Sequence, residues 1–149
     1  MSTPEPALRL PAATVSWRSY YELTKPRVVM LIVFTSIVGT LLASPGWPSL
    51  EPLLFGNLGI ALAAACAATI NHVLDERIDI QMSRTRGRPL PTGQLSARNA
   101  LLFAAVLGSA SMLILWALVN TLTAALTFAS LIGYAVIYTA FLKRATPQN

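Results

Sequence analysis

The stretch from residue 52 to residue 79, PLLFGNLGIALAAACAATINHVLDERID, decides the fold of this chain. Its first part, Pro52 to Leu74, is 23 residues long and carries no charged residue. A helix needs roughly 20 apolar residues to cross the hydrocarbon core of a bilayer, which is about 30 Å thick. The stretch therefore predicts a membrane-spanning helix with charged residues at its end.

Two other uncharged runs predict three more spans. The helix in the run 28–50 should end near Ala43, because a Ser-Pro-Gly turn sequence follows. The run 99–142 has 44 residues and as one helix would measure about 66 Å, so it should break near Asn120. The expected fold class is all-α, a polytopic transmembrane helix bundle with spans at about 24–43, 52–74, 99–119 and 122–142.

Composition also indicates a membrane protein. Hydrophobic residues make up 54% of the chain and charged residues 11%, whereas a soluble domain carries about a quarter charged residues. A soluble core could not bury this much apolar surface, so the lipid bilayer must serve as solvent for part of it. Residues 1–16 are rich in Pro, Ala, Ser and Thr and are expected to form a disordered tail, with residues 17–149 as the membrane domain.

The basic residues predict the orientation of the four spans. A four-span topology places all 11 lysines and arginines on one side, in the N-terminal segment, the connection 75–98 and the C-terminal segment. By the positive-inside rule that side is cytoplasmic. The net charge of +5 thus reflects topology, and we expect no nucleic-acid partner.

A row of oxygen-bearing side chains lies at the cytoplasmic end of the second span. Asn71, Asp75 and Asp79 are spaced four residues apart, which on a helix places them in one stripe. Two carboxylates and an amide oxygen are hard ligands that suit Mg²⁺, which also takes waters and substrate phosphates. The stripe is therefore a candidate metal site.

Three arginines follow this stripe at alternate positions, Arg84, Arg86 and Arg88. Guanidinium groups match phosphate oxygens, so the loop offers both metal ligands and cations to a diphosphate. The spacing leaves a second interpretation open, in which the aspartates and arginines pair with one another and the arginines only set the topology. Charged groups near an apolar run are costly, which favours the functional interpretation.

Several other residues are candidates for a cavity beside this site. His72, the only histidine, is expected to find a hydrogen bond near the helix end, with a place in the cavity wall or a role as haem ligand as the alternative. Tyr134, Tyr138 and Phe141 share one helix face and could line a cavity and stabilise a cation, or pack against a neighbouring helix. The alanine-rich run 61–68 predicts that the second span is buried among other helices.

Four motifs resemble the intramembrane prenyltransferases of the UbiA type. These are YYELTKPR at 20–27, the Asn-Asp-Asp pattern at 71–79, RTRGRPLP at 84–91 and KRATPQN at 143–149. The whole set is similar to the branch that farnesylates haem, whereas the aspartate pattern alone marks only the family. The resemblance covers 17–149 and implies a bundle of about nine helices, of which four spans are present here.

The resemblance implies a reaction and roles for residues. Farnesyl diphosphate would bind through Mg²⁺ to Asn71, Asp75 and Asp79, with the two aspartates as catalytic residues. Lys25 and the three arginines would contact the diphosphate. The vinyl group of haem B would attack the farnesyl cation, giving haem O, the precursor of haem A. Haem A synthase or oxidase assembly partners, and a place in the bacterial inner membrane, are implied in the same way.

The chain departs from the family pattern in one respect. The family has a second aspartate-bearing loop, and no second acidic cluster occurs in this sequence. We therefore expect an N-terminal fragment with little turnover of its own. A prenyltransferase acting on a quinone precursor is the first alternative, and a non-enzymatic membrane or transporter fragment is the second. The span interiors carry no ionisable residue, which argues against a transporter.

Overall fold

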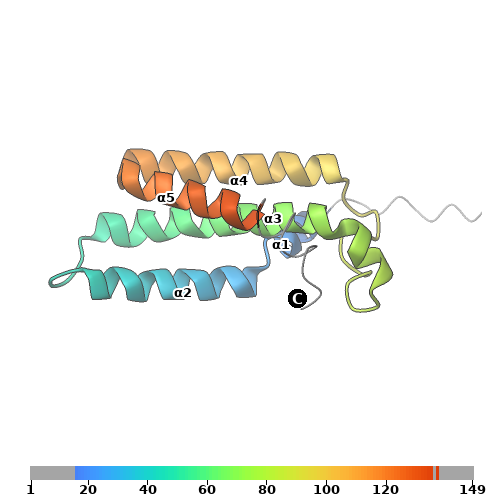
Figure 1. Cartoon of the computed structure of the whole chain (residues 1–149), viewed down its shortest axis with the longest axis horizontal. Coiled ribbons are helices and arrows are strands. Elements are labelled where there is room, and N and C mark those ends of the chain that lie inside the picture. Colours follow the sequence, from blue (N-terminus) through green and yellow to red (C-terminus); the bar gives the residue numbers. More distant parts are fainter. Residues whose placement is uncertain (1–15, 136, 138–149) are drawn as a thin grey trace, which may run out of the picture.

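The computed structural model describes residues 16–135 and 137, which form helices joined by turns and by one longer loop, 82–96 (Figure 1). The helices are α1 (Trp17–Leu23), α2 (Pro26–Ala43), α3 (Asn57–Gln81), α4 (Ala97–Leu118) and α5 (Thr121–Ile132), and a π-helical turn, η1 (Pro52–Gly56), precedes α3.

Three helices are long and apolar enough to cross a membrane: Pro26–Ala43, Pro52–Arg77 and Ala97–Leu118. The fourth predicted span is described as the shorter apolar helix Thr121–Ala135, and its remainder lies outside the described residues together with Tyr138 and Phe141. The prediction of an all-α polytopic membrane protein is confirmed. The predicted tail also lies outside the described residues, except Ser16, which caps α1.

The ends of the helices follow from local chemistry. The side chain of Asn120 accepts a hydrogen bond from the backbone N–H of Thr123 at 2.7 Å, so the predicted break becomes the N-cap of α5. The first span begins at Pro26, because Lys25 before it adopts a left-handed backbone with φ of 50°. This break makes α1 a separate helix, which the predicted span 24–43 did not include. At the other end of the second span, α3 stays helical through Gln81, so the connection to α4 begins later than residue 75.

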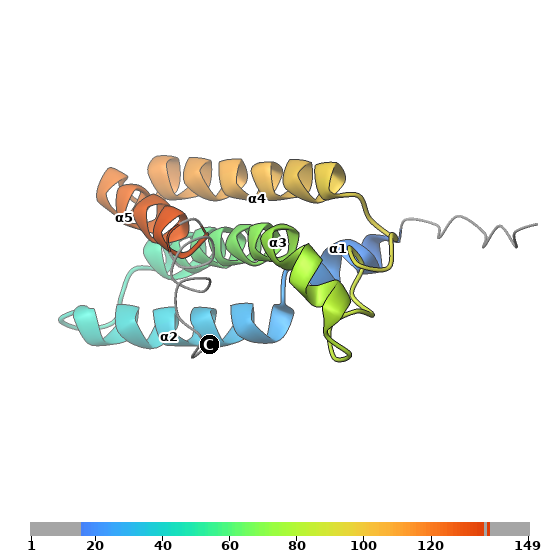
Figure 2. The same ribbon diagram turned by 45° about the vertical axis from the view of Figure 1, so that its right-hand side comes forward.

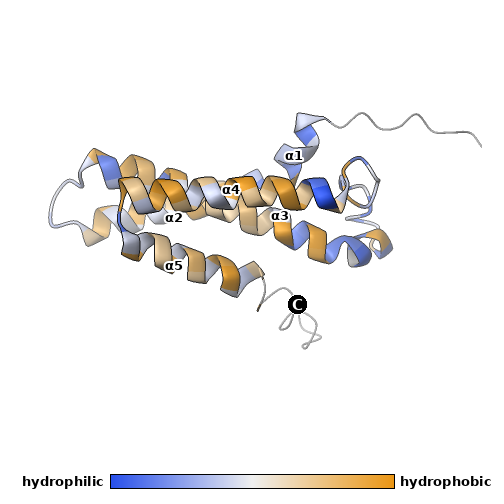
Figure 3. Ribbon diagram, turned by 90° about the horizontal axis from the view of Figure 1, so that it is seen from above, coloured by the Kyte–Doolittle hydropathy of each residue, from blue (hydrophilic) through white to orange (hydrophobic). Residues whose placement is uncertain are grey.

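The long helices run alternately up and down, so the connections gather at two ends (Figures 1 and 2). One end carries the α2–η1 connection and the α4–α5 turn. The other carries α1 and the loop 82–96. Every Lys and Arg among the described residues belongs to this second end, where polar colours concentrate in Figure 3. The predicted separation of charge therefore holds for the described part of the chain.

The helix α3 packs closely against α4 through small residues. An added side chain at Gly59 would meet Leu115 of α4 at 2.5 Å, and the hydroxyl of Ser111 donates a hydrogen bond to the carbonyl of Gly59 at 2.6 Å. Gly108 of α4 faces Cys66 in the same way. Half of the apolar window of α3 is buried, against none of α2, which confirms the prediction from the alanine-rich run.

Candidate functional site

The predicted stripe lies on the last turns of α3 and is buried. Asn71, Asp75 and Asp79 are 5%, 6% and 4% exposed, and the helix is continuous through all three. Positions four apart on such a helix lie along one side. Burying two carboxylates is unfavourable unless positive groups or a cation offset their desolvation. The stripe is therefore placed where a cation would stabilise it.

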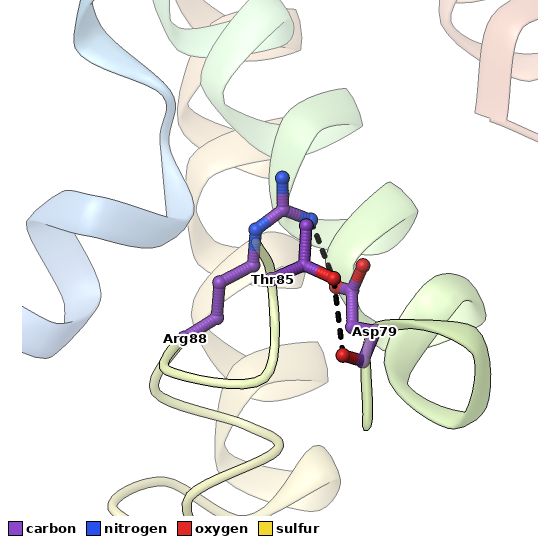
Figure 4. A network of polar contacts seen from close by, with 3 residues as sticks. All are labelled: Asp79, Thr85 and Arg88. Atoms are coloured by element: carbon purple, nitrogen blue, oxygen red, sulfur yellow. Dashed lines mark hydrogen bonds and ion pairs between the residues drawn. The ribbon is translucent and has the colours of Figure 1, made fainter. Parts of the chain in front are cut away.

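Arg88 supplies one such positive group (Figure 4). Its guanidinium lies 2.8 Å from the carboxylate of Asp79, in an ion pair whose arginine side chain is 30% exposed. The hydroxyl of Thr85 donates to the backbone carbonyl of Asp79 at 3.0 Å and so satisfies an acceptor at the end of α3. These two bonds fold the loop back over the end of the stripe.

The same loop is anchored in an apolar cluster on its other side. Leu90 and Leu95 are 2% exposed and pack with Leu23 of α1 and Ala100 of α4. The side chain of Ser19 in α1 also donates to Gln94 at 3.3 Å. The position of Arg88 is thus set by the packing of α1, and not by the loop sequence alone.

The three predicted arginines are separated by this fold. Arg88 reaches the stripe, whereas Arg84 and Arg86 are exposed. Contact of Arg84 or Arg86 with a diphosphate stays a prediction. The ion pair between Asp79 and Arg88 agrees with the alternative in which aspartates pair with arginines. A ligand at the stripe could rearrange this pair.

Lys25 brings a second positive group from the start of α2. Among the described residues it is the one non-glycine position with a positive φ, and it caps α2 immediately before Pro26. A strained backbone of this kind persists where the surroundings enforce it, often at a binding site. Its side chain lines the cavity described below and lies within electrostatic reach of His72.

An apolar cavity of about 410 Å³ lies between α2, α3 and α5. This volume is within the range of small-ligand sites, about 300–1,000 Å³. Its α3 wall is made of Ile60 and alanines up to Ala68, roughly one turn before Asn71. Tyr134 from the end of α5 also lines it, which supports the cavity-lining alternative for this residue. The cavity thus leads along α3 toward the polar stripe.

His72 differs from its expectation. Its side chain is 4% exposed, and neither ring nitrogen has a hydrogen-bond partner among the described residues, so the predicted hydrogen bond is wrong. The reason is its place on a continuous helix, away from any helix end whose groups would need a partner. It does not line the apolar cavity either.

The stripe fits a metal ion shared with a ligand better than a closed metal site. No group of three or more His, Cys, Asp or Glu side chains that could hold a metal occurs in the part of the chain that the structure describes. Two carboxylates and one amide leave half of the positions of an octahedral ion to waters and phosphate oxygens, which is how Mg²⁺ is usually held. The donor set is compatible with Mg²⁺, and its presence stays a prediction.

Sequence reasoning missed the features that depend on tertiary packing. The separate helix α1 and the burial of Leu90 and Leu95 were not predicted. The sequence did contain a signal for the separate helix α1. Lys25 precedes Pro26, and a residue before proline disfavours the helical backbone conformation, so a helix tends to end there. Two leucines in a polar loop were a weak signal for the second.

Comparison with known proteins places the chain in a family. Residues 32–149 match the UbiA prenyltransferase family. A Marinobacter nauticus protein named protoheme IX farnesyltransferase is 61% identical over 138 residues, which cover 93% of this chain and 46% of the relative. Relatives of the same name from Nitrosococcus oceani and Shewanella baltica are 61% and 58% identical, over 92% and 94% of this chain and 46% of each relative.

The chain therefore spans less than half the length of the curated relatives that it matches. No solved structure matches it. The match to the family covers most of the chain and includes the stripe, the arginine loop and most of the residues that line the cavity, but not Lys25 and Val28. With its apolar spans, this shows that the chain is an integral membrane protein that belongs to the UbiA prenyltransferase family.

Proposed function

We propose that this chain supplies a diphosphate-binding part of an enzyme that transfers a farnesyl group from farnesyl diphosphate to the vinyl group of haem B, giving haem O. The observation that carries the proposal is a juxtaposition along α3. An apolar cavity of about 410 Å³ is followed, roughly one turn later, by buried oxygen ligands with cationic side chains beside them. A ligand with an apolar tail and a charged head matches both parts at once.

The residues divide the work between tail and head. The alanines of α3 and apolar side chains of α2 and α5 would hold the isoprenoid tail, because they expose little polar surface. Asn71, Asp75 and Asp79 would hold Mg²⁺ against the diphosphate. When bound, this ion supplies positive charge to the leaving oxygen atoms.

Lys25 and Arg88 would add positive charge on two sides of the same head group. Stabilising charge that grows on the leaving diphosphate is the main requirement of this reaction class, and preorganised cations meet it. Arg88 would exchange its bond to Asp79 for one to a diphosphate oxygen as the ligand enters. Burial of the site would keep water away from the allylic cation.

The choice of haem B as acceptor rests on the relatives. Each of the three described above is named protoheme IX farnesyltransferase, and identities near 60% over almost the whole chain support the same acceptor. The proposal also includes the bacterial inner membrane, with α1 and the loop 82–96 on the cytoplasmic side. Haem A synthase or an oxidase assembly factor would take the product.

A chimera tests the proposal. Residues 1–149 would replace the matching part of the Marinobacter nauticus relative, and membranes with the chimera would receive farnesyl diphosphate, haem B and Mg²⁺. We expect mass spectrometry to detect haem O, at a rate within about tenfold of the unmodified relative, since a shift of roughly 1.4 kcal/mol at the fused interface is tolerable.

Two outcomes would contradict the proposal. A prenylated quinone precursor, formed in place of haem O when both acceptors are offered, would favour the first alternative. A well-folded chimera that forms neither product, beside an active unmodified relative, would favour a non-enzymatic role.

A further inference from the structure

His72 is the one imidazole of the chain, and it is buried without a hydrogen-bond partner among the described residues. The sequence holds a single histidine, its side chain is 4% exposed, and both ring nitrogens lack hydrogen bonds within the described part of the structure. A buried donor without a partner is unfavourable relative to a paired one, because it has lost its bonds to water. Such a group calls for an explanation, and a ligand that completes its hydrogen bonds is the simplest.

The location of His72 indicates where that ligand lies. His72 precedes Asp79 by seven residues, about two helical turns, so both project from nearly the same side of α3. The charges of Lys25, Arg88, Asp79 and Asp75 all act on the imidazole. The ring therefore lies among the groups that are proposed to hold the diphosphate.

Two of the four neighbouring charges are positive, and the other two belong to Asp75 and Asp79, which the proposed Mg²⁺ would neutralise, so a diphosphate oxygen is the partner that this site would offer. Lys25 and Arg88 approach the imidazole from two different elements, the start of α2 and the loop after α3. An imidazole carries at least one N–H donor in either tautomer, so it can donate to a phosphate oxygen without a change of protonation. Axial binding to a haem iron fits less well, because a porphyrin needs an open, flat space beside the ring, and His72 lines none of three cavities found among the described residues.

We propose that His72 donates a ring N–H hydrogen bond to an oxygen of the diphosphate, as a further binding residue of the site. This inference rests on the proposed function, because it takes the same head group as ligand. It assigns the imidazole a binding role in place of the structural hydrogen bond expected from the sequence. It also explains why a polar ring is kept buried without a partner until the ligand arrives.

The single histidine makes a direct test possible. The whole chain, labelled with isotopic nitrogen in histidine and held in lipid nanodiscs, would give ring signals from His72 alone. Inorganic pyrophosphate with Mg²⁺ is the probe. We expect the ring N–H signal to shift, and to be protected from solvent exchange, with the same saturation curve that phosphorus NMR gives for the pyrophosphate.

Variants separate a hydrogen bond from a packing role. His72→Leu should bind pyrophosphate about tenfold more weakly or worse, as expected for a lost bond to a charged acceptor. His72→Gln keeps an N–H donor and should lose less than about threefold. Thr69→Val is the matched control, because Thr69 is 0% exposed on the preceding turn, and its affinity should equal that of the unmodified chain.

Three other outcomes would contradict either the role of His72 alone or the diphosphate site as a whole. If pyrophosphate binds while the ring signals stay unchanged, or if His72→Leu binds as tightly as the unmodified chain, the inference fails and the diphosphate site stands. If the unmodified chain shows no saturable pyrophosphate binding, the proposed site and the inference both fall. A haem spectrum typical of histidine ligation, lost in His72→Leu, together with unchanged ring signals on adding pyrophosphate, would assign His72 to the iron.

Discussion

The two halves of α3 bury different kinds of groups. The first half meets α4 through Gly59 and Cys66, where small side chains let the helices approach closely. The second half buries an amide, an imidazole and two carboxylates, and the imidazole has no hydrogen-bond partner in the described part of the chain. The comparison teaches that one helix combines a closely packed apolar half with a buried polar half, which we propose is completed by a ligand.

The largest effect should follow from removing a carboxylate at the polar end. Asp79→Ala in the chimera should abolish Mg²⁺-dependent formation of haem O, a loss of at least about a hundredfold, because the ion would lose a buried ligand. Product would be measured by mass spectrometry after equal membrane loading. Asp75→Ala should behave alike, and rates near those of the unmodified chimera in either variant would refute the assignment.

A bulky side chain at the close-packed half should damage stability instead. Gly59→Leu would place its Cβ 2.5 Å from Leu115, and overpacking of this kind costs about 1–3 kcal/mol. Unfolding in a detergent titration would measure the loss. Adding Leu115→Ala should recover part of the lost stability, since this second substitution removes the side-chain atoms that clash. A double variant that is no more stable than Gly59→Leu would contradict this packing.

Arg88 and Arg84 lie in the same loop, so their alanine variants can be compared directly. Arg88→Ala removes the ion pair with Asp79 and should weaken pyrophosphate binding about tenfold, in line with a bond between charged groups. Arg84→Ala should change affinity by less than about threefold, because Arg84 is exposed. Calorimetry on both variants would check this, and equal losses would show that the loop acts only through its net charge.

The smallest effect is expected for a single hydrogen bond between helices. Ser111→Ala removes the bond to the carbonyl of Gly59, and such bonds contribute about 0.6 kcal/mol on average in membranes. Detergent titration should show a loss of this size with unchanged pyrophosphate affinity. A clear loss of pyrophosphate affinity would mean that the two halves of α3 are coupled.

The same division explains what could be predicted from the sequence. The spans could be predicted because the thickness of a bilayer sets the minimum length of an uncharged run that crosses it. The stripe could be predicted because residues four apart on any helix lie on the same side. The break at Asn120 was found for a similar reason, since its side chain caps the next helix.

The remaining features depend on contacts between distant segments. The sequence did not show which of the three loop arginines reaches the stripe. In the structure Arg88 does, and Leu90 and Leu95 beside it pack against α1, a contact that no local sequence pattern encodes. The lack of a hydrogen-bond partner for His72 among the described residues likewise depends on which side chains surround it in space. Lys25 was assigned to the diphosphate by resemblance, and its left-handed backbone at the edge of the cavity came only from the structure.

The most direct test of the central claim is the electron paramagnetic resonance of Mn²⁺, used in place of Mg²⁺, with the whole chain in nanodiscs. The account predicts that Mn²⁺ binds together with pyrophosphate and that Asp75→Asn with Asp79→Asn removes the bound signal, because the buried carboxylates of α3 hold the ion. A bound Mn²⁺ signal of equal size in the unmodified chain and in the double variant would contradict it.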